Sequence, residues 1–376
     1  MTSATRSQAV PIPSWLRPWQ LTLVALLVYL LAILQPRAWD PMALVRVGTR
    51  FDPGLAGGSM GYDGQFSYQI AESPLGNTGK LDVPAYRLQR ILYPLVARLA
   101  AMGNRGLIPW SLVLVNIAAA TAGVALTESV MRHYGRSPWW ALAYGMNVGM
   151  FMAVRLDLTE PLAFAFVQAG VLAWARGRHN LAAVAFAAAA LTKEVTVVLL
   201  VAYLVVRTLR AGWRRGATWG AIALGPFLLW QAILWGSLGS PGFGSGGALS
   251  SSFEILPFRG WWSLALFDLR DFATVSVLVV PMIVVPVVAG LVCAVKSLSN
   301  GLTASAAALL IQSAVFLFLP TSNLVDPLGS ARFVLGLIVA TLNFGAEVGW
   351  RRVLAYSQLW ILTLAFLPGD RLLPSG

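Results

Sequence analysis

The chain of 376 residues is far more apolar than a soluble domain, with 57% hydrophobic and 11% charged residues. Soluble domains carry about 25% charged residues. The mean hydropathy of +0.71, with 35 glycines and 15 tryptophans, is typical of a protein with many membrane spans. This excludes a soluble globular enzyme, a disordered chain and a secreted disulfide scaffold. Cys293 is the single cysteine and lies in an apolar run, so neither a disulfide nor a thiolate metal cluster is expected.

The net charge of +12 would suggest nucleic-acid binding in a soluble protein. In a membrane protein, the rule that cytoplasmic loops are rich in lysine and arginine explains it better. We therefore expect membrane lipids as partners and no nucleic acid.

Apolar segments close to the roughly 20 residues that a membrane helix needs recur along the whole chain. We predict eleven spans, at 19–35, 109–131, 138–154, 160–175, 180–192, 195–209, 217–236, 272–295, 302–319, 331–348 and 353–368. Three of them, 138–154, 160–175 and 180–192, are short or polar at one end, as segments that end at a solvent-filled cavity often are. Pro36 and the lack of a cleavage site favour a retained first span over a signal peptide. Residues 1–18 then form a short cytoplasmic tail.

The positions of lysine and arginine predict the sidedness of the spans. With the N-terminus in the cytoplasm, every inner connection is short and basic, as the positive-inside rule requires. The basic residues on that side are Arg6, Arg17, Arg132, Arg136, Arg176, Arg178, Arg207, Arg210, Arg214, Arg215, Lys296, Arg351 and Arg352. We therefore expect the N-terminus inside and the C-terminus outside.

Two long hydrophilic segments, 36–108 and 237–271, then face outwards. Within the first, residues 88–102 place apolar side chains at helical spacing, which predicts an amphipathic helix in the membrane interface. The apolar side chains are Ile91, Leu92, Leu95, Leu99 and Met102, with Arg90 and Arg98 apart from them. The Gly/Ser-rich stretch 237–252 is interpreted either as a lid over a membrane cavity or as a tolerated linker.

Ionisable side chains gather at the outer ends of the spans. Charge near membrane depth is energetically costly, so the presence of these side chains needs an explanation. Four outer connections carry them: GYDGQFSYQIA and LDVPAYRLQRILYP with Asp63, Arg87 and Arg90; RLDLTEP with Arg155, Asp157 and Glu160; LTKE with Lys193 and Glu194; and DPLGSARF with Asp326 and Arg332. This convergence predicts a polar cavity that opens outwards and holds both signs of charge.

Structural roles for the same residues stay open. Any single cluster could be a loop at the level of the lipid headgroups. Lys193 and Glu194 could form a local ion pair that closes a turn. Thr159 as N-cap, with Glu160 and Pro161 in the first turn, is a favourable helix start.

Asp63 is the strongest candidate for a catalytic residue. Its Asp-Gly step could be an ordinary turn, but a solvated turn does not need the neighbouring aromatics Tyr62, Phe66 and Tyr68. One carboxylate beside several arginines suits a hydroxyl nucleophile and a phosphate leaving group. The carboxylate accepts the hydroxyl proton, and the guanidinium groups hold the phosphate as its charge develops. Outside a membrane there is no nucleotide pool, so the donor is expected to be a lipid phosphate.

The phrase GYDGQFSYQIAESPLG, followed by LDVPAYRLQRILYPLVA, resembles the first-loop pattern of the GT-C superfamily of integral membrane glycosyltransferases. It is most similar to bacterial members described as mannosyltransferase-like or as cell-surface glycopolymer formation proteins. LTEP, LTKE and the late ARF motif are similar as well. The resemblance implies an all-α polytopic fold with a GT-C-like catalytic domain at 19–348, followed by a last span and an outer tail at 349–376.

The resemblance also implies an activity: inverting transfer of a sugar from a polyprenyl-phosphate donor to a hydroxyl of a glycan or glycolipid acceptor. The site would face outwards from a bacterial inner membrane. Asp63 would be the general base, and Arg87, Arg90, Arg332 and Lys193 would contact the donor phosphate. Residues with a substrate-binding or structural role are Tyr62, Gln65, Tyr68, Arg155, Asp157, Glu160 and Glu194.

Metal binding is a further implication of the resemblance. Some members bind a divalent metal through acids placed like Asp157 and Glu160, which makes these two the candidate ligands. The chain departs from members with two adjacent acids in the first loop, because Asp63 stands alone there, between Asp52 and Glu72.

Three other functions remain open. A transporter or lipid flippase would need polar groups through the depth of the spans, and many transporters show an internal repeat that this sequence lacks. A non-catalytic, lipid-binding subunit of a glycopolymer assembly system would keep the cavity without the chemistry. A ligase would use a polyprenyl-diphosphate glycan in place of the smaller donor.

Overall fold

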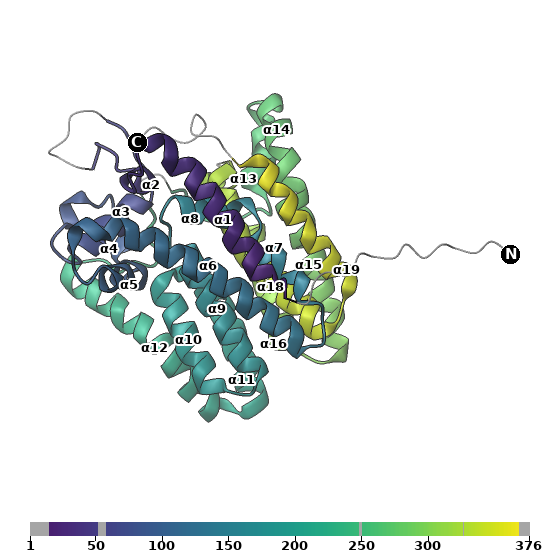
Figure 1. Ribbon diagram of the computed structural model, residues 1–376. Helices are drawn as coiled ribbons and strands as arrows, with labels where there is room; N and C mark the ends of the chain where they lie inside the picture. Colours follow the sequence, from purple (N-terminus) through teal and green to yellow (C-terminus); the bar gives the residue numbers. More distant parts are fainter. Residues whose placement is uncertain (1–14, 52–57, 248–249, 326, 368–376) are drawn as a thin grey trace.

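A computed structural model describes residues 15–51, 58–247, 250–325 and 327–367, and these residues form helices and turns without a β-strand. Most of the predicted N-terminal tail, the outer tail, Asp52 and Asp326 lie outside the described residues. Figure 1 shows the helices as one bundle, with short helices gathered at one end.

Five stretches are long and apolar enough to cross a membrane, by length and composition. They contain α1 (Pro18–Leu34), α6 (Ile108–His133), α12 (Trp213–Leu238), α14 (Leu269–Val279) with α15 (Val285–Ser297), and α18 (Pro327–Val348). A π-helical segment, Val280–Val284, joins α14 to α15 and contains Pro281. These stretches confirm the predicted spans 19–35, 109–131, 217–236, 272–295 and 331–348 as helices. The chain is thus an all-α protein suited to a multi-pass membrane position.

Four other predicted spans correspond to shorter helices. These are α9 (Glu160–Ala175), α10 (His179–Thr192), α11 (Val197–Ala211) and α16 (Ala304–Leu317). α9, α10 and α16 are apolar but shorter than 18 residues. Helices of this length do not cross the full hydrocarbon core alone. The polar residues Glu160, at the start of α9, and Thr192, at the end of α10, are buried inside the protein.

The last two predicted spans, 138–154 and 353–368, are not continuous helices. The first consists of a 3₁₀ turn (Pro138–Ala141), α7 (Leu142–Gly145) and α8 (Val148–Arg155), and the second of α19 (Arg351–Ser357) and a 3₁₀ segment (Gln358–Phe366). Asn147 explains the first break. Its Oδ1 accepts from the N–H of Met150 at the start of α8, and its Nδ2 donates to the carbonyls of Ala143 and Tyr144 at the end of α7. One buried side chain therefore caps two helix ends.

α18 is the central helix of the bundle. In the most apolar stretch of α18, 72% of the residues are buried inside the protein. The corresponding shares are 28% for α1 and 22% for α12, whose apolar faces point outwards. Gln168 on α9 links α18 to α6, since it donates to Thr127 Oγ1 at 2.8 Å and accepts from Asn343 Nδ2 at 3.1 Å. Such hydrogen bonds hold helices together where apolar side chains alone give little specificity.

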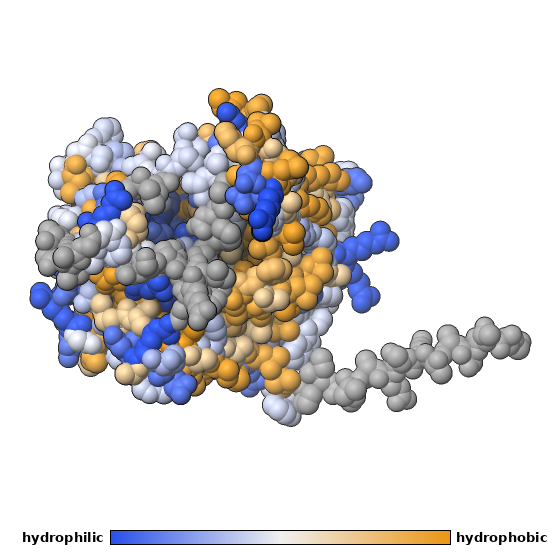
Figure 2. Space-filling model, turned by 90° about the horizontal axis from the view of Figure 1, so that it is seen from above, coloured by the Kyte–Doolittle hydropathy of each residue, from blue (hydrophilic) through white to orange (hydrophobic). Residues whose placement is uncertain are grey.

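The short helices α2 (Met42–Val45), α3 (Gly64–Glu72), α4 (Pro84–Leu88) and α5 (Leu92–Ala100) gather at one end of the bundle (Figure 1). α3 and α5 pack on α6, and α4 packs on α12. Hydrophilic residues are concentrated on this side in Figure 2, whereas the side of α14 and α15 is mainly apolar. α13 (Arg259–Trp262) and α17 (Thr321–Val325) pack on each other.

The predicted amphipathic helix 88–102 is interrupted. The chain turns at Gln89–Ile91, because Pro94 lacks the N–H that a continuous helix would need and so falls in the first turn of α5. Ile91 is buried, while Leu99 and Met102 are 75% and 86% exposed. The predicted apolar face is therefore divided, and only its far end reaches the surface.

Hydrogen bonds connect predicted inner segments with one another. Trp19 N donates to Glu128, Arg136 donates to the carbonyl of Ala346, and Arg210 donates to that of Leu302. The predicted outer connections meet one another in the same way, as described next. These contacts join segments that the sequence predicts to lie on the same side of the membrane, and the sidedness itself stays a prediction.

Candidate functional site

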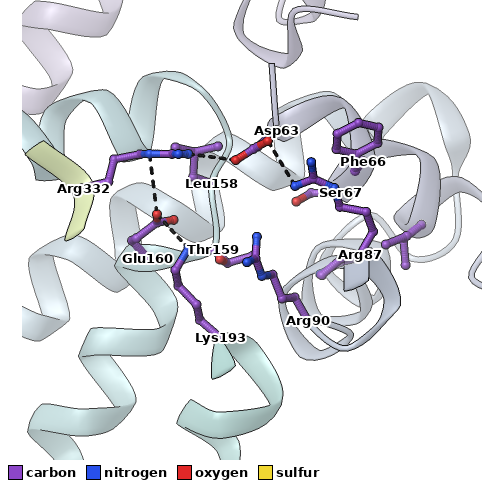
Figure 3. Close-up of a pocket in the computed structure, with 12 residues that line it drawn as sticks. Asp63, Phe66, Ser67, Arg87, Arg90, Leu158, Thr159, Glu160, Lys193 and Arg332 are labelled. Atoms are coloured by element: carbon purple, nitrogen blue, oxygen red, sulfur yellow. Dashed lines mark hydrogen bonds and ion pairs between the residues drawn. The ribbon is translucent and has the colours of Figure 1, made fainter. Parts of the chain in front are cut away.

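Asp63 lies between two guanidinium groups that come from opposite ends of the sequence. Arg87 Nη1 donates to its Oδ1 at 3.1 Å, and Arg332 Nη1 donates to its Oδ2 at 3.0 Å. The Asp63 side chain is 32% exposed, whereas the side chains of Arg87 and Arg332 are 8% and 12% exposed. Asp63 is also the N-cap residue of α3, yet its carboxylate caps no backbone N–H. The carboxylate is therefore committed to the two arginines and not to a turn (Figure 3).

Gly64 fixes the position of Asp63 by letting the start of α3 approach the α8–α9 connection. A Cβ at Gly64 would lie 2.0 Å from the carbonyl oxygen of Leu156. Gln65 holds the preceding loop, since its Oε1 accepts from Gly48 N and its Nε2 donates to the carbonyl of Met60. Local backbone packing thus places Asp63, and the Gly of the Asp-Gly step is required by contact.

Arg87 is held from behind by Asp82. Its Nε and Nη2 both donate to the Asp82 carboxylate at 2.7 Å, which leaves Nη1 for Asp63. The guanidinium also lies over the ring of Phe66, 4.0 Å from its centroid. A paired fork of this kind sets orientation as well as charge. Gly247 of the predicted lid segment lies against this pair, and a Cβ there would be 3.0 Å from Arg87 Nη2.

Arg90 and Glu194 form a second fork. Arg90 donates through Nε at 2.8 Å and Nη2 at 2.6 Å to the two Glu194 oxygens, and Nη2 also donates to the Tyr86 hydroxyl. Burial would raise the pKa of Glu194, but the charge and hydrogen bonds of Arg90 outweigh it and lower the pKa to about 2.

Lys193 pairs with Glu160 and not with its neighbour Glu194. Its Nζ donates to Glu160 Oε1 at 2.9 Å, and Arg332 Nε lies 4.0 Å from the same oxygen. The local Lys193–Glu194 pair that the sequence left open is therefore not formed. Thr159 does occupy the N-cap position of α9, but its side chain makes no capping hydrogen bond there.

These pairs join into one pocket. It is lined by Asp63, Phe66, Ser67, Ile70, Arg87, Arg90, Pro94, Leu158, Thr159, Glu160, Lys193 and Arg332. Four cations (Arg87, Arg90, Lys193, Arg332) face four carboxylates (Asp63, Asp82, Glu160, Glu194) in the described structure. The cavity between the side chains has a volume of about 20 Å³, which is room for about one water molecule.

Asp63 stays ionised in this environment. Burial alone would raise its pKa, but the guanidinium groups of Arg87, Arg332 and Arg90 outweigh burial and hold the pKa of Asp63 far below its usual range. A carboxylate with so low a proton affinity is a weak base in this arrangement.

Asp157 lies outside the pocket lining, against Gly64, and its pKa is shifted in the opposite direction. It is fully buried, has a positive φ of 52°, and neither carboxyl oxygen has a hydrogen-bond partner within the described residues. Burial raises the pKa of Asp157 well above its usual range, because a charged carboxylate is costly to bury without a partner. Its Cβ lies 3.3 Å from where a Cβ on Gly64 would be.

Among the residues expected at the site, Asp63, Arg87, Arg90, Arg332, Lys193 and Glu160 line the pocket. Glu194 lies behind Arg90, and the ring of Tyr62 is 5.1 Å from the Arg332 guanidinium. Tyr68, Gln65, Arg155 and Asp157 do not line it.

The residues outside the pocket have contacts of their own. Tyr68 packs against the apolar cluster around α5 and α6, Gln65 holds the loop, and Arg155 donates to the Tyr29 hydroxyl at 3.1 Å. These side chains fit the structural alternative better than substrate binding.

The sequence analysis missed Asp82 and Tyr86, which orient Arg87 and Arg90, and Ser67 in the lining. Tyr86 stands four residues before Arg90, whereas Asp82 stands five residues before Arg87 and precedes α4. A search for partners at helical spacing would have found Tyr86 but not Asp82.

The pocket does not fit the implied metal site. Glu160 is already paired with an ammonium and faces a guanidinium, while Asp157 is fully buried and outside the pocket lining. No group of three His, Cys, Asp or Glu side chains suited to a metal ion occurs among the residues the structure describes.

Comparison with protein-family models, curated proteins and solved structures gave no match. What the pocket can do is therefore judged from its own charges and geometry. It combines an ionised carboxylate, partly open to solvent, with four cations able to hold an oxyanion. Deprotonation of a hydroxyl next to a leaving phosphate is chemistry that this set can perform.

Proposed function

We propose that the chain is a membrane glycosyltransferase of the GT-C type that uses a polyprenyl-phosphate-linked sugar as donor. The acceptor is a hydroxyl of a glycan or glycolipid, and the reaction takes place on the outer face of a bacterial inner membrane. The observation that carries the proposal is the Asp63 carboxylate held between Arg87 and Arg332 at one end of an apolar helix bundle.

The reaction follows from the roles these groups can take. The Asp63 carboxylate accepts the proton of the acceptor hydroxyl, and the hydroxyl oxygen forms a bond to the anomeric carbon. The bond between that carbon and the phosphate oxygen breaks on the opposite face, which inverts the configuration. The lipid phosphate leaves with one more negative charge, which Arg332, Arg87, Arg90 and Lys193 stabilise.

Charge placement supports an enzyme over a transporter. The ion pairs of the pocket lie together at the short helices α3 to α5 and the ends of α9, α10 and α18. The polar contacts deeper in the bundle, such as Gln168 with Thr127 and Asn343, are neutral and join neighbouring helices by hydrogen bonds. Neutral contacts of this kind hold helices together, whereas an ion path through a membrane protein is marked by ionisable groups.

The test is whether the purified chain consumes a donor by itself. Reconstituted in lipid nanodiscs with a radiolabelled polyprenyl-phosphate sugar and envelope glycolipids as acceptors, it should release polyprenyl phosphate and label an acceptor. Binding of the donor without turnover would identify a non-catalytic lipid-binding subunit. Movement of intact donor across a vesicle membrane would identify a flippase.

A further inference from the structure

Arg332 differs from the other arginines of the pocket in how it is held. Arg87 donates two hydrogen bonds to the Asp82 carboxylate, and Arg90 donates two to the Glu194 carboxylate. Each of these guanidinium groups is therefore fixed by its own acid. Within the described residues, Arg332 donates only its Nη1 to a carboxylate, at Asp63. Its Nε is buried without a hydrogen-bond partner and lies 4.0 Å from Glu160 Oε1.

An unpaired, buried N–H on a guanidinium is costly unless an acceptor arrives. The Nε edge of Arg332 has the donor geometry that recognises a phosphate. The cavity beside it holds about one water, so an anion the size of a phosphate can enter only if side chains around Asp63 part. Of the two arginines paired with Asp63, Arg332 is the one that no second carboxylate holds through two hydrogen bonds. Its other contacts are longer: Glu160 Oε1 lies 4.0 Å from its Nε, and the Tyr62 ring centroid 5.1 Å from its guanidinium.

We propose that Arg332 switches between two anions: it holds Asp63 inactive in the donor-free protein and moves to the phosphate when the donor binds. The inference rests on the proposed function and adds its order of events. Donor binding comes first and frees one oxygen of Asp63 for the acceptor hydroxyl. After transfer, the protonated Asp63 no longer attracts Arg332, and the phosphate with its added charge does. Release of the lipid phosphate returns the guanidinium to the carboxylate.

The switch predicts competition between Asp63 and the phosphate for one guanidinium, which a double-mutant cycle measures. The four proteins are wild type, Asp63→Asn, Arg332→Gln and the double variant, all in nanodiscs. The probe is a polyprenyl monophosphate without sugar, so no turnover is needed. With Arg332 present, Asp63→Asn should tighten binding by about tenfold; without it, the gain should fall below about twofold.

Simple charge repulsion between Asp63 and the phosphate would give the same gain in both backgrounds, and that result would overturn the switch. A complete lack of binding in all four proteins would overturn the proposed function, and the switch with it. Arg332→Lys keeps the positive charge but lacks the planar guanidinium. In this background, Asp63→Asn should tighten binding by an intermediate factor. Arg105→Gln changes an exposed arginine of the first outer loop, which also carries Asp63; this variant is the control and should leave the tighter binding caused by Asp63→Asn unchanged.

A second measurement works on the donor-free protein. Carbodiimides react with protonated carboxyl groups, so a carboxylate held by Arg332 is protected at pH 5. Peptide mass spectrometry should show labelling of Asp63 rising at least several-fold in Arg332→Gln and unchanged in Arg105→Gln. Equal labelling of Asp63 in Arg332→Gln and in the wild type would contradict the inactive state.

Discussion

Asp63 and Asp157 lie on either side of the contact that Gly64 makes, and their surroundings shift their pKa values in opposite directions. Two arginines keep Asp63 ionised, while Asp157 is buried in a left-handed conformation with no hydrogen-bond partner in the described structure. Composition alone does not distinguish the two acids. The sequence placed both at one level of the protein, and only the three-dimensional contacts tell which one the arginines reach.

Replacement of Asp157 by Asn should be well tolerated. Asn accepts a positive φ and carries no charge to bury. Because burial raises the folded-state pKa of Asp157, the wild type loses stability relative to the variant as the pH rises toward that pKa. Melting temperatures in detergent should therefore be closest at pH 4, near the ordinary aspartate pKa, and favour Asp157→Asn at pH 8. A lower melting temperature for the variant at both values would contradict a raised pKa for Asp157.

Glu194 shows the reverse dependence. Its folded-state pKa of about 2 lies below the ordinary glutamate value, so the fork with Arg90 stabilises the protein above about pH 4.5 and is lost as the pH falls toward 2. Glu194→Gln should lower the melting temperature clearly at pH 7 and progressively less at pH 4 and pH 3. A loss of the same size at every pH would mean that the side chain acts through packing and not through its charge.

The elements around the pocket depend on close backbone contacts. Gly64→Ala puts a methyl group within 2.0 Å of the Leu156 carbonyl, so α3 or the α8–α9 connection must move. We expect transfer activity to fall by about a hundredfold, because a displacement of about 1 Å at a reacting group has that effect. Gly79→Ala is the control, since no atom lies within 4 Å of a Cβ there. Equal activities of the two variants would show that Asp63 is not positioned by this contact.

Sequence reasoning located most elements but not their interruptions. Nine of the eleven predicted spans are helices, five of them long enough to cross a membrane, because length and hydropathy suffice to predict an apolar helix. They did not reveal that Asn147 caps α7 and α8 inside an apolar stretch, or that Pro94 divides the predicted interfacial helix. The sequence did not predict the ion-pair partners either. Lys193 and Glu194 are neighbours in the chain, but Lys193 pairs with Glu160 and Glu194 pairs with Arg90.

At the scale of the whole molecule, the predicted sidedness can be tested with single cysteines. In a Cys293→Ser background, Leu75→Cys lies in the first outer loop and Ser299→Cys beside Lys296 on the predicted inner side, both at exposed positions. A membrane-impermeant maleimide should label Leu75→Cys in intact spheroplasts and Ser299→Cys only after permeabilisation. The opposite pattern would place the pocket in the cytoplasm, where a nucleotide-linked donor would become the better candidate.

The most direct test of the whole account compares Asp63 and Asp157 in one transfer assay. Purified wild type, Asp63→Asn and Asp157→Asn are given a labelled polyprenyl-phosphate sugar under single-turnover conditions, with folding checked by size-exclusion chromatography. We predict that Asp63→Asn loses transfer by about a thousandfold or more while still binding the lipid, and that Asp157→Asn stays within about threefold of wild type. Unimpaired transfer by Asp63→Asn would contradict the assignment of this carboxylate as the base.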